Sequence, residues 1–203
     1  MAKKAYVYNG SAWEDLASSI SDLSSYATTV NLDNYQLKSV AGLTLINTTT
    51  FSAVSSQSIN DAFSATYDNY LILIGATGST TNQDINFRLR ISSTDNTSAV
   101  YSRSSLYQSS TTVSGQRLTG ITSWIGIFDA QSGVKQSGRL LIFNPFIVEY
   151  TSAIQDAVGA PNGNVEQTRR TFGTTVTTSY TGFTVFPTAG TITGTVSVYG
   201  YAK

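Results

Sequence analysis

The sequence predicts a mainly β protein: an antiparallel β-sandwich head of jelly-roll-like topology, preceded by a small hairpin and a short coiled-coil helix. Its polar residues are largely Ser, Thr, Asn and Gly, and its 12 Tyr and 9 Phe suit pleated, half-buried surfaces. Apolar residues alternate with a period of two over much of the chain. Polar, turn-rich segments separate these alternating runs.

The first of two predicted regions, residues 1–40, is an N-terminal attachment and oligomerisation segment, and residues 41–203 form the head. Near the start, Asn9-Gly10 separates two short β-prone runs between Ala5 and Trp13. Because Asn-Gly adopts the positive φ angles of a tight turn, these runs predict a hairpin. An ordered arm without a hairpin is the alternative.

A heptad-like spacing of apolar residues follows the hairpin. Two identical helices or three can bury such a narrow stripe together, whereas a single helix this rich in serine is marginal alone. The alternative is a helix packed on its own β domain. The predicted oligomerisation seam consists of Leu16, Ile20, Leu23, Ala27 and Val30.

About eight strands are expected in the head. The apolar run Tyr70–Ile74 indicates a central strand covered on both faces. The other predicted strands are Leu43–Phe51, Asn86–Ile91, Ser123–Phe128, Arg139–Phe143, Gly182–Phe186 and Thr191–Tyr199.

Turns and breaks complete the prediction for the head. Pro187–Gly190 joins the last two strands as a hairpin turn, and Asn144-Pro145 ends the strand Arg139–Phe143. Gly194 marks a bulge or a close backbone approach. Loops are predicted at Gly75–Asp84, Ser92–Ala99, Ser109–Gly115 and Ala157–Asn164.

Charge and composition exclude several classes of function. Lys+Arg and Asp+Glu both number 12, and no basic cluster beyond pairs occurs, so nucleic-acid binding is not expected. Cysteine and histidine are absent, which excludes disulfides and zinc sites of the usual ligands. No apolar run is long enough to span a bilayer, and the N-terminus lacks a signal-peptide core, so we expect no membrane insertion and assembly in a cytoplasm.

No catalytic, cofactor or metal site is predicted. A Ser–His or Cys–His nucleophile is impossible without histidine and cysteine. The acids of the β region are scattered singly, which favours turn and surface roles, although two of them converging in space would suit glycoside hydrolysis. Asp95-Asn96-Thr97 offers oxygens for calcium but no calcium-loop pattern, and is interpreted as a turn.

Aromatic residues in or beside loop-rich stretches are the candidates for receptor binding. Tyr101, Tyr107 and Trp124 are the three that we single out. Aromatic faces bind sugars, but most aromatics of a β-sandwich form its core or cross-strand pairs, and that remains the alternative for each.

Two stretches resemble structural proteins of tailed bacteriophages. The opening Ala5-Tyr-Val-Tyr-Asn-Gly-Ser-Ala-Trp-Glu-Asp-Leu16 resembles an element at the front of many tail-fibre and minor structural proteins. Parts of the head are similar to C-terminal domains of fibre-type proteins: Phe63–Ile74, Phe87–Arg90, Ile142–Pro145 and Thr191–Tyr201. The resemblance implies a trimeric β-sandwich head attached to a phage particle, with Tyr6, Tyr8 and Trp13 in the attachment element.

The expected function is therefore that of a non-enzymatic virion protein, assembled in the host cytoplasm. It is expected to be a short-fibre or tail-fibre subunit involved in host attachment, with three kinds of partner: itself as a homotrimer, other virion proteins, and a host surface glycan or protein. A capsid decoration protein that stabilises the shell is the alternative. A polysaccharide-degrading tailspike is a remote one, because such enzymes usually carry a longer repetitive β-helix.

Overall fold

The protein is described here by a computed structural model covering residues 6–8, 10–15, 42–80, 83–109, 112–159 and 166–203. The chain divides into two compact units, residues 1–41 and 42–203, and each is described by itself. Every regular element among the described residues is a strand in an antiparallel sheet. The predicted β class is thus confirmed. The predicted helical seam, Leu16 to Val30, lies outside the described residues.

The first unit contains a two-stranded antiparallel sheet. Strand β1 (Tyr6–Tyr8) pairs with β2 (Trp13–Asp15), in the register Tyr8 opposite Trp13. Gly10 has a φ of 96°, a value that is strained for residues with a Cβ. The hairpin predicted between Ala5 and Trp13 is confirmed.

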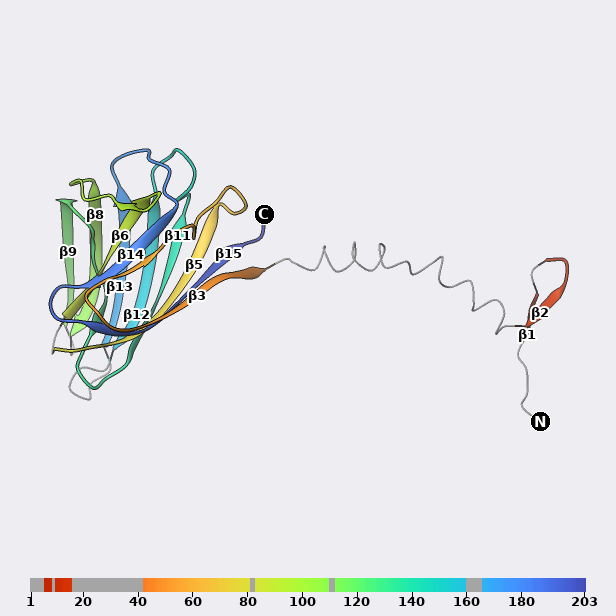
Figure 1. Cartoon of the computed structure of the whole chain (residues 1–203), viewed down its shortest axis with the longest axis horizontal. Coiled ribbons are helices and arrows are strands. Elements are labelled where there is room, and N and C mark those ends of the chain that lie inside the picture. The colour runs from red at the N-terminus through yellow and green to blue at the C-terminus, as the bar shows by residue number, and fades with distance from the viewer. Residues whose placement is uncertain (1–5, 9, 16–41, 81–82, 110–111, 160–165) are drawn as a thin grey trace. The chain divides into compact units, whose positions relative to one another are not determined.

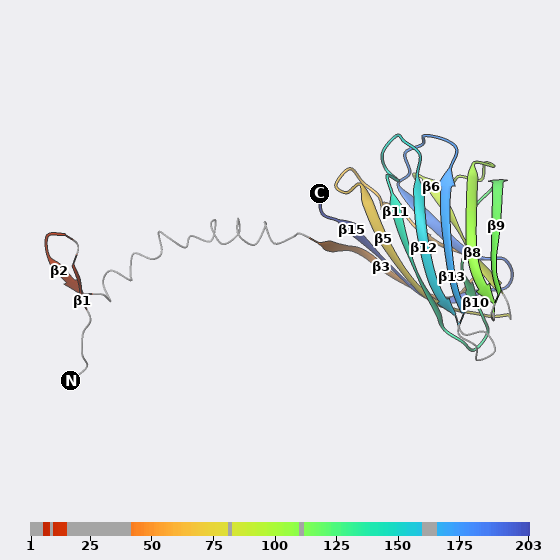
Figure 2. The same cartoon turned by 180° about the vertical axis from the view of Figure 1, so that it is seen from behind.

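The second unit, the head, contains an eight-stranded sheet that faces the viewer in Figure 2. All of its neighbouring strands run antiparallel. Its strands, in spatial order, are β3 (Leu43–Val54), β15 (Ile192–Tyr201), β5 (Asn69–Gly78), β11 (Gln136–Phe143), β12 (Ser152–Gly159), β13 (Glu166–Thr174), β8 (Tyr101–Ser109) and β9 (Thr112–Ile121).

A five-stranded antiparallel sheet forms the other layer of the head (Figure 1). Side chains of both sheets meet in one hydrophobic core. The strands of the smaller sheet, in spatial order, are β10 (Trp124–Ala130), β6 (Gln83–Ile91), β14 (Gly182–Pro187) and β4 (Gln57–Ile59), with the short β7 (Thr94–Asp95) paired to β6.

Eight of these strands pair in a nested order. The outermost pair along the chain is β3 with β15, followed inward by β4 with β14, β5 with β11, and β6 with β10. Successive pairs alternate between the large and the small sheet. The arrangement is that of one long double strand folded back and forth across the core.

Two additional hairpins widen the large sheet beyond this nested set. One, β8–β9, lies between β6 and β10 in the chain, and the other, β12–β13, lies between β11 and β14. Strand β13 pairs with β8, so the two hairpins join into one four-stranded extension on β11. The sequence analysis missed these four strands and placed loops over parts of three of them, because Ser, Thr, Gln and Arg make up much of β8, β9 and β13, and β12 has only Ile154 and Val158 as larger apolar residues.

A row of aromatic rings links the two sheets through the core. Neighbouring ring centroids in the row lie 4.6–5.8 Å apart, which is the range of favourable aromatic pairs. The row starts on β5 and ends on β13, both in the large sheet, and passes through the small sheet between them. Its members, in order, are Tyr70, Phe63, Phe183, Phe87, Trp124 and Phe172.

The central strand β5 is confirmed in position but is covered on one face only. It lies between β15 and β11, and Tyr70, Ile72 and Ile74 point into the core. Leu71 and Leu73 alternate with them and point to the outer side of the large sheet, where Leu73 is exposed. The prediction of cover on both faces is therefore not met within one chain.

The hairpin predicted at Pro187–Gly190 is wrong, because β14 and β15 lie in different sheets and this segment crosses between them. Two other predicted backbone features are confirmed at single residues. Strand β11 ends at Phe143, and Asn144 follows with a positive φ of 56°. Gly194 lies at a register shift between β15 and β3, and a Cβ there would be 2.2 Å from the carbonyl oxygen of Gly75. Gly194 therefore marks both a bulge and a close backbone approach.

Candidate functional site

The predicted attachment residues lie on the surface of the N-terminal hairpin. Tyr6, Tyr8 and Trp13 are all exposed. The rings of Tyr8 and Trp13 lie directly across the two strands, with centroids 5.3 Å apart. Aromatic side chains of this kind present rigid apolar area together with a polar group, a combination that is enriched at protein interfaces. The hairpin therefore offers an aromatic surface that a partner protein can cover.

Two of the predicted receptor-binding residues lie in the core instead. Tyr101 and Trp124 are fully buried, so neither has accessible surface with which to meet a receptor. The Tyr101 hydroxyl donates to the carbonyl of Asn96 at 2.9 Å and accepts from the amide of Leu89 at 3.2 Å. Trp124 Nε1 donates to the carbonyl of Gly173 at 3.1 Å. Both side chains lie in the core and connect strands, as the alternative interpretation of these aromatics expected. The side chain of Tyr107 lies outside the described part of the chain.

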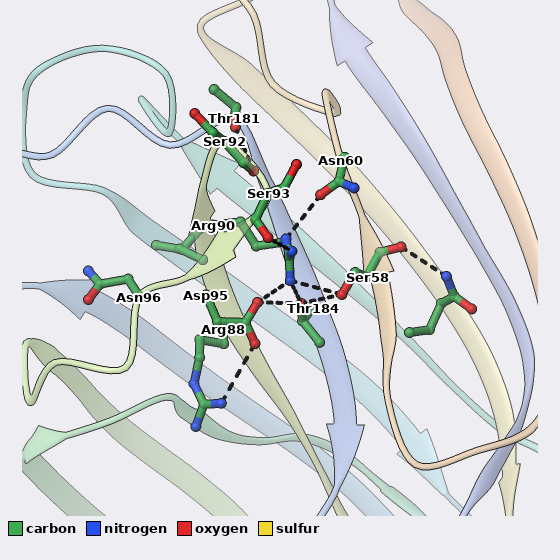
Figure 3. A network of polar contacts seen from close by, with 12 residues as sticks. Ser58, Asn60, Arg88, Arg90, Ser92, Ser93, Asp95, Asn96, Thr181 and Thr184 are labelled. Atoms are coloured by element: carbon green, nitrogen blue, oxygen red, sulfur yellow. Dashed lines mark hydrogen bonds and ion pairs between the residues drawn. The ribbon is translucent and has the colours of Figure 1, made fainter.

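The densest polar network of the head surrounds Arg90 on the outer side of the small sheet (Figure 3). Arg90 Nε donates to Asn60 Oδ1 at 3.0 Å, and its Nη1 donates to Ser58 Oγ at 2.9 Å and Thr184 Oγ1 at 2.7 Å. The guanidinium also contacts the Asp95 carboxylate and the carbonyl of Ser93. This single side chain therefore connects β4, β6 and β14 to the loop that carries β7.

Asp95 is the acidic centre of the same network. It accepts a hydrogen bond of 2.7 Å from Thr184 Oγ1, and Arg88 lies 3.7 Å away. The predicted turn at Asp95–Thr97 thus uses its carboxylate to bind arginine, and the short strand β7 forms there. The neighbouring Asn96 donates to the hydroxyl of Tyr180 at 3.0 Å, which extends the network towards the core. The network around Arg90 and Asp95 therefore fits a structural role, in which it holds the strands of the small sheet and the β7 loop together. We call it the clasp.

A second charged cluster lies between the four-stranded extension and β10. Arg103 Nη1 donates to the carbonyl of Ile125 at 3.0 Å, and Arg170 donates to the carbonyl of Gly126. Desolvation lowers the pKa of Arg103, the charge of Arg170 lowers it further, and Asp84 and Asp129 oppose the shift. The adjacent Arg169 points to the outer side instead, because neighbouring residues of a strand alternate.

Part of the interior beneath the extension is polar, whereas the rest of the core is apolar. Arg170 lies opposite Gln155 on one neighbouring strand and opposite Ser105 on the other. Buried polar atoms without a hydrogen-bond partner gather among the inward-facing side chains here: Arg103 Nε, Ser105 Oγ, Gln155 Oε1 and Arg170 Nε. Sequence reasoning missed this cluster, because it required the strand assignments of β8 and β13.

The outer side of the large sheet carries a row of apolar side chains across β3, β15, β5, β11 and β12. The strand register aligns Leu45, Tyr199, Leu71, Leu141 and Ile154 in one row across these strands. We call the whole set the outer apolar face. Its members are Leu43, Leu45, Leu71, Leu73, Leu141, Phe143, Ile154, Tyr199 and Tyr201.

An open groove of about 630 Å³ borders this face at Leu73. Gly75 lies along it without a side chain, and Lys135 lines it beside Gly75, with its Cε 2.9 Å from where a Cβ of Gly75 would be. Arg139 lies directly opposite Leu73 across β5 and β11, and Asp156 lies opposite Arg139 on β12, where the two form an ion pair of 3.0 Å. On β11 and β12 the outer apolar face therefore borders directly on a charged pair.

Comparisons with known proteins identify no relative: no family model, no curated protein and no solved structure matches the chain. Among the described residues, no group of three or more His, Cys, Asp or Glu side chains is placed to hold a metal ion. The part of the chain that the structure describes also contains no helix long and apolar enough to cross a bilayer.

Proposed function

We propose that this chain is a non-enzymatic structural protein of a bacteriophage particle, a short-fibre or tail-fibre subunit that forms a homotrimer and takes part in host attachment. The structural observation that supports the proposal is the nested pairing of eight strands in the head, taken together with the sequence resemblance. The phage-like opening sequence Ala5–Leu16 and the exposed aromatics of the hairpin are consistent with it.

The nested pairing supports a jelly-roll β-sandwich with two inserted hairpins. If the eight strands are numbered along the chain, the first pairs with the eighth, the second with the seventh, the third with the sixth and the fourth with the fifth. Two Greek keys wound together have this order, and they form the jelly rolls of viral capsid and lectin domains. A fold does not fix a function, so the sequence resemblance is needed to favour a phage particle.

A non-enzymatic role is supported by what the acidic residues of the head contact. Asp68 lies 2.8 Å from Lys203, Asp156 lies 3.0 Å from Arg139, and Asp95 contacts Arg90. A glycosidase of the usual kind needs two carboxylates facing a substrate across the bond that breaks. These three carboxylates instead connect strands and the chain end, which favours a structural role over a tailspike enzyme.

The proposed arrangement assigns a task to each part of the chain. The hairpin docks on the particle through Tyr6, Tyr8 and Trp13, residues 16–30 associate as a three-helix stalk, and the head meets the host surface. Burial of the seam contributes several kcal/mol at roughly 25 cal/mol per Å² of apolar surface, and ordering of the chains offsets much of it. A contact between heads is therefore needed to complete the trimer.

The test is to locate the protein on purified particles of the phage that encodes it. Gold-labelled antibody against the head is expected at the tail tip, and light scattering of the isolated protein is expected to give three times the mass of one chain. Labelling spread over the capsid would support the decoration role instead. Absence from the particle, or release of reducing sugars from host envelope material, would overturn the proposal.

A further inference from the structure

We propose that the outer apolar face is the surface through which the heads of identical chains associate. This inference rests on the proposed homo-oligomer and names the part of the head that completes it. The occupant is a second copy of this chain, and the contact covers β3, β15, β5, β11 and β12 rather than the whole sheet.

The chemistry of the face is the first reason. None of its nine members carries a charge, and they come from five adjacent strands. Leu45 is 55% exposed and Leu73 is 40% exposed, although both lie in a region of large apolar neighbours. Single exposed leucines are ordinary on protein surfaces, but a contiguous patch of this kind marks an interaction site.

The course of the chain is the second reason, because it favours a second copy over another partner. The face begins at Leu43 and Leu45, the first residues of the head, and twelve residues separate Leu43 from Val30, the last residue of the predicted seam. Association of the seams would hold identical heads within a few tens of ångströms, since each residue spans at most about 3.5 Å. Such tethering raises the effective concentration of one face for another.

The distribution of charge limits the contact on β11 and β12 to the part of these strands that carries Leu141, Phe143 and Ile154. In the cross-strand row of Leu73, Asp156 binds Arg139 at 3.0 Å and lies 3.7 Å from Arg169. Removing these charges from water would cost free energy that a modest ion pair does not return. The remaining strands β13, β8 and β9 are mostly polar on this side, so we assign them to the rim or to solvent.

Edge strand β3 gives the third reason. It is 12 residues long, pairs only with β15 among the described strands, and contains neither lysine nor proline. Natural sheets usually protect a long edge with such residues, or cover it, because it otherwise recruits other chains. Cover by a neighbouring head would protect the edge and bury Leu43 and Leu45 together.

Thiol labelling provides the test, because the chain contains no cysteine. The variants Leu45→Cys and Leu73→Cys place a thiol in the proposed contact. The controls Leu106→Cys and Val113→Cys lie on the same side of the sheet but on β8 and β9, with 60% and 66% of the native side chains exposed. All four are made in the full chain, and their rates of reaction with a soluble disulfide reagent are compared at high protein concentration.

We expect the first two thiols to react at least about tenfold more slowly than the controls, and to match them after dilution below the dissociation constant. Light scattering on the same samples reports the oligomeric state. If the protein is oligomeric and all four thiols react alike, the face is overturned while the proposed trimer stands. If the protein is monomeric at every concentration, the face and the trimer fall together, and particle labelling alone decides the virion role.

Discussion

Arg90 shows how one side chain can fix several backbone segments. Its guanidinium is nearly buried, with 10% of the side chain exposed, and it binds groups from β4, β14 and the loop that carries β7. A buried cation costs free energy unless it is paired and hydrogen-bonded. Asp95 supplies the compensating charge, so stability depends on both members.

Removing the charge of Asp95 is expected to destabilise the head. Asp95→Asn leaves Arg90 without its counter-ion, and we expect a loss of about 2 kcal/mol in the free energy of unfolding. Asp156→Asn is the matched control, since the two carboxylates are similarly exposed (24% and 28%) but Asp156 pairs with an exposed arginine. That control is expected to lose less than about 1 kcal/mol. Urea denaturation measures both, and equal losses would contradict the clasp.

Buried tyrosines make the stability of the head depend on alkaline pH. Desolvation raises the pKa of Tyr101, Tyr70 and Tyr180 above the ordinary value of 10.0. Unfolded chains would then release these protons at a lower pH than the folded protein. The stabilising contribution of these tyrosines is therefore complete below about pH 10, and the free energy of unfolding falls as the pH rises above that value.

The variant Tyr101→Phe tests this dependence at one residue. Loss of the hydroxyl leaves the carbonyl of Asn96 and the amide of Leu89 without this partner, so we expect a cost of about 1–2 kcal/mol at neutral pH. Between about pH 9 and about pH 11 the variant should lose less stability than the native protein, because one raised pKa has been removed. A parallel decline in both proteins would refute the role of Tyr101.

At the scale of the element, Gly194 decides how closely β15 and β5 approach. A Cβ on Gly194 would lie 2.2 Å from the carbonyl oxygen of Gly75 and 2.8 Å from Ala76. We expect Gly194→Ala to lower the free energy of unfolding by about 1–3 kcal/mol, because backbone must shift. Gly115→Ala is the control, since its nearest atom would be 3.7 Å away, and it should be neutral or slightly stabilising. Thermal unfolding of the two variants makes the comparison.

Strands with an apolar pattern could be predicted from the sequence, and polar strands could not. Tyr70–Ile74 and Asn86–Ile91 lie within β5 and β6, because burial in the core required a hydrophobic alternation that is visible in the chain. Strands β8 and β13 pair mainly with other strands of the extension and present Ser, Thr and Arg to both sides. Their stability comes from the ladder and from neighbouring strands, so local sequence carries little signal.

Which side chains lie on the surface could be predicted less well from the sequence than where the strands lie. Tyr101 and Trp124 lie beside polar stretches, but their burial depends on how two sheets face each other, which no local pattern reveals. The outer apolar face likewise needs cross-strand register, which aligns Leu45 with Tyr199 and Leu71. Only the exposed hairpin aromatics follow from sequence alone, because two short strands and one turn define them.

For the whole molecule, assembly is expected to depend on the predicted seam as well as on the head. Leu23→Asp would place a charge in every copy of the seam, and we expect the dissociation constant of the oligomer to rise by about tenfold or more. Ser25→Asp is the control, because position 25 lies away from the seam in the same heptad spacing. Sedimentation equilibrium gives both constants, and equal effects would argue against a seam at these residues.

The first and last described residues of the head lie side by side, and this limits where a fused tag or label can be attached. The amide of Ala202 donates to the carbonyl of Gly42 at 3.0 Å, so a fusion at the C-terminus emerges beside the point where the preceding segment enters. A bulky tag there would crowd Leu43 and Tyr201 of the outer apolar face, and could therefore disturb a test of the proposed association. The exposed turn Thr188–Gly190 lies at the opposite end of β15, roughly 33 Å away at 3.3 Å per residue, and is the better position for a label.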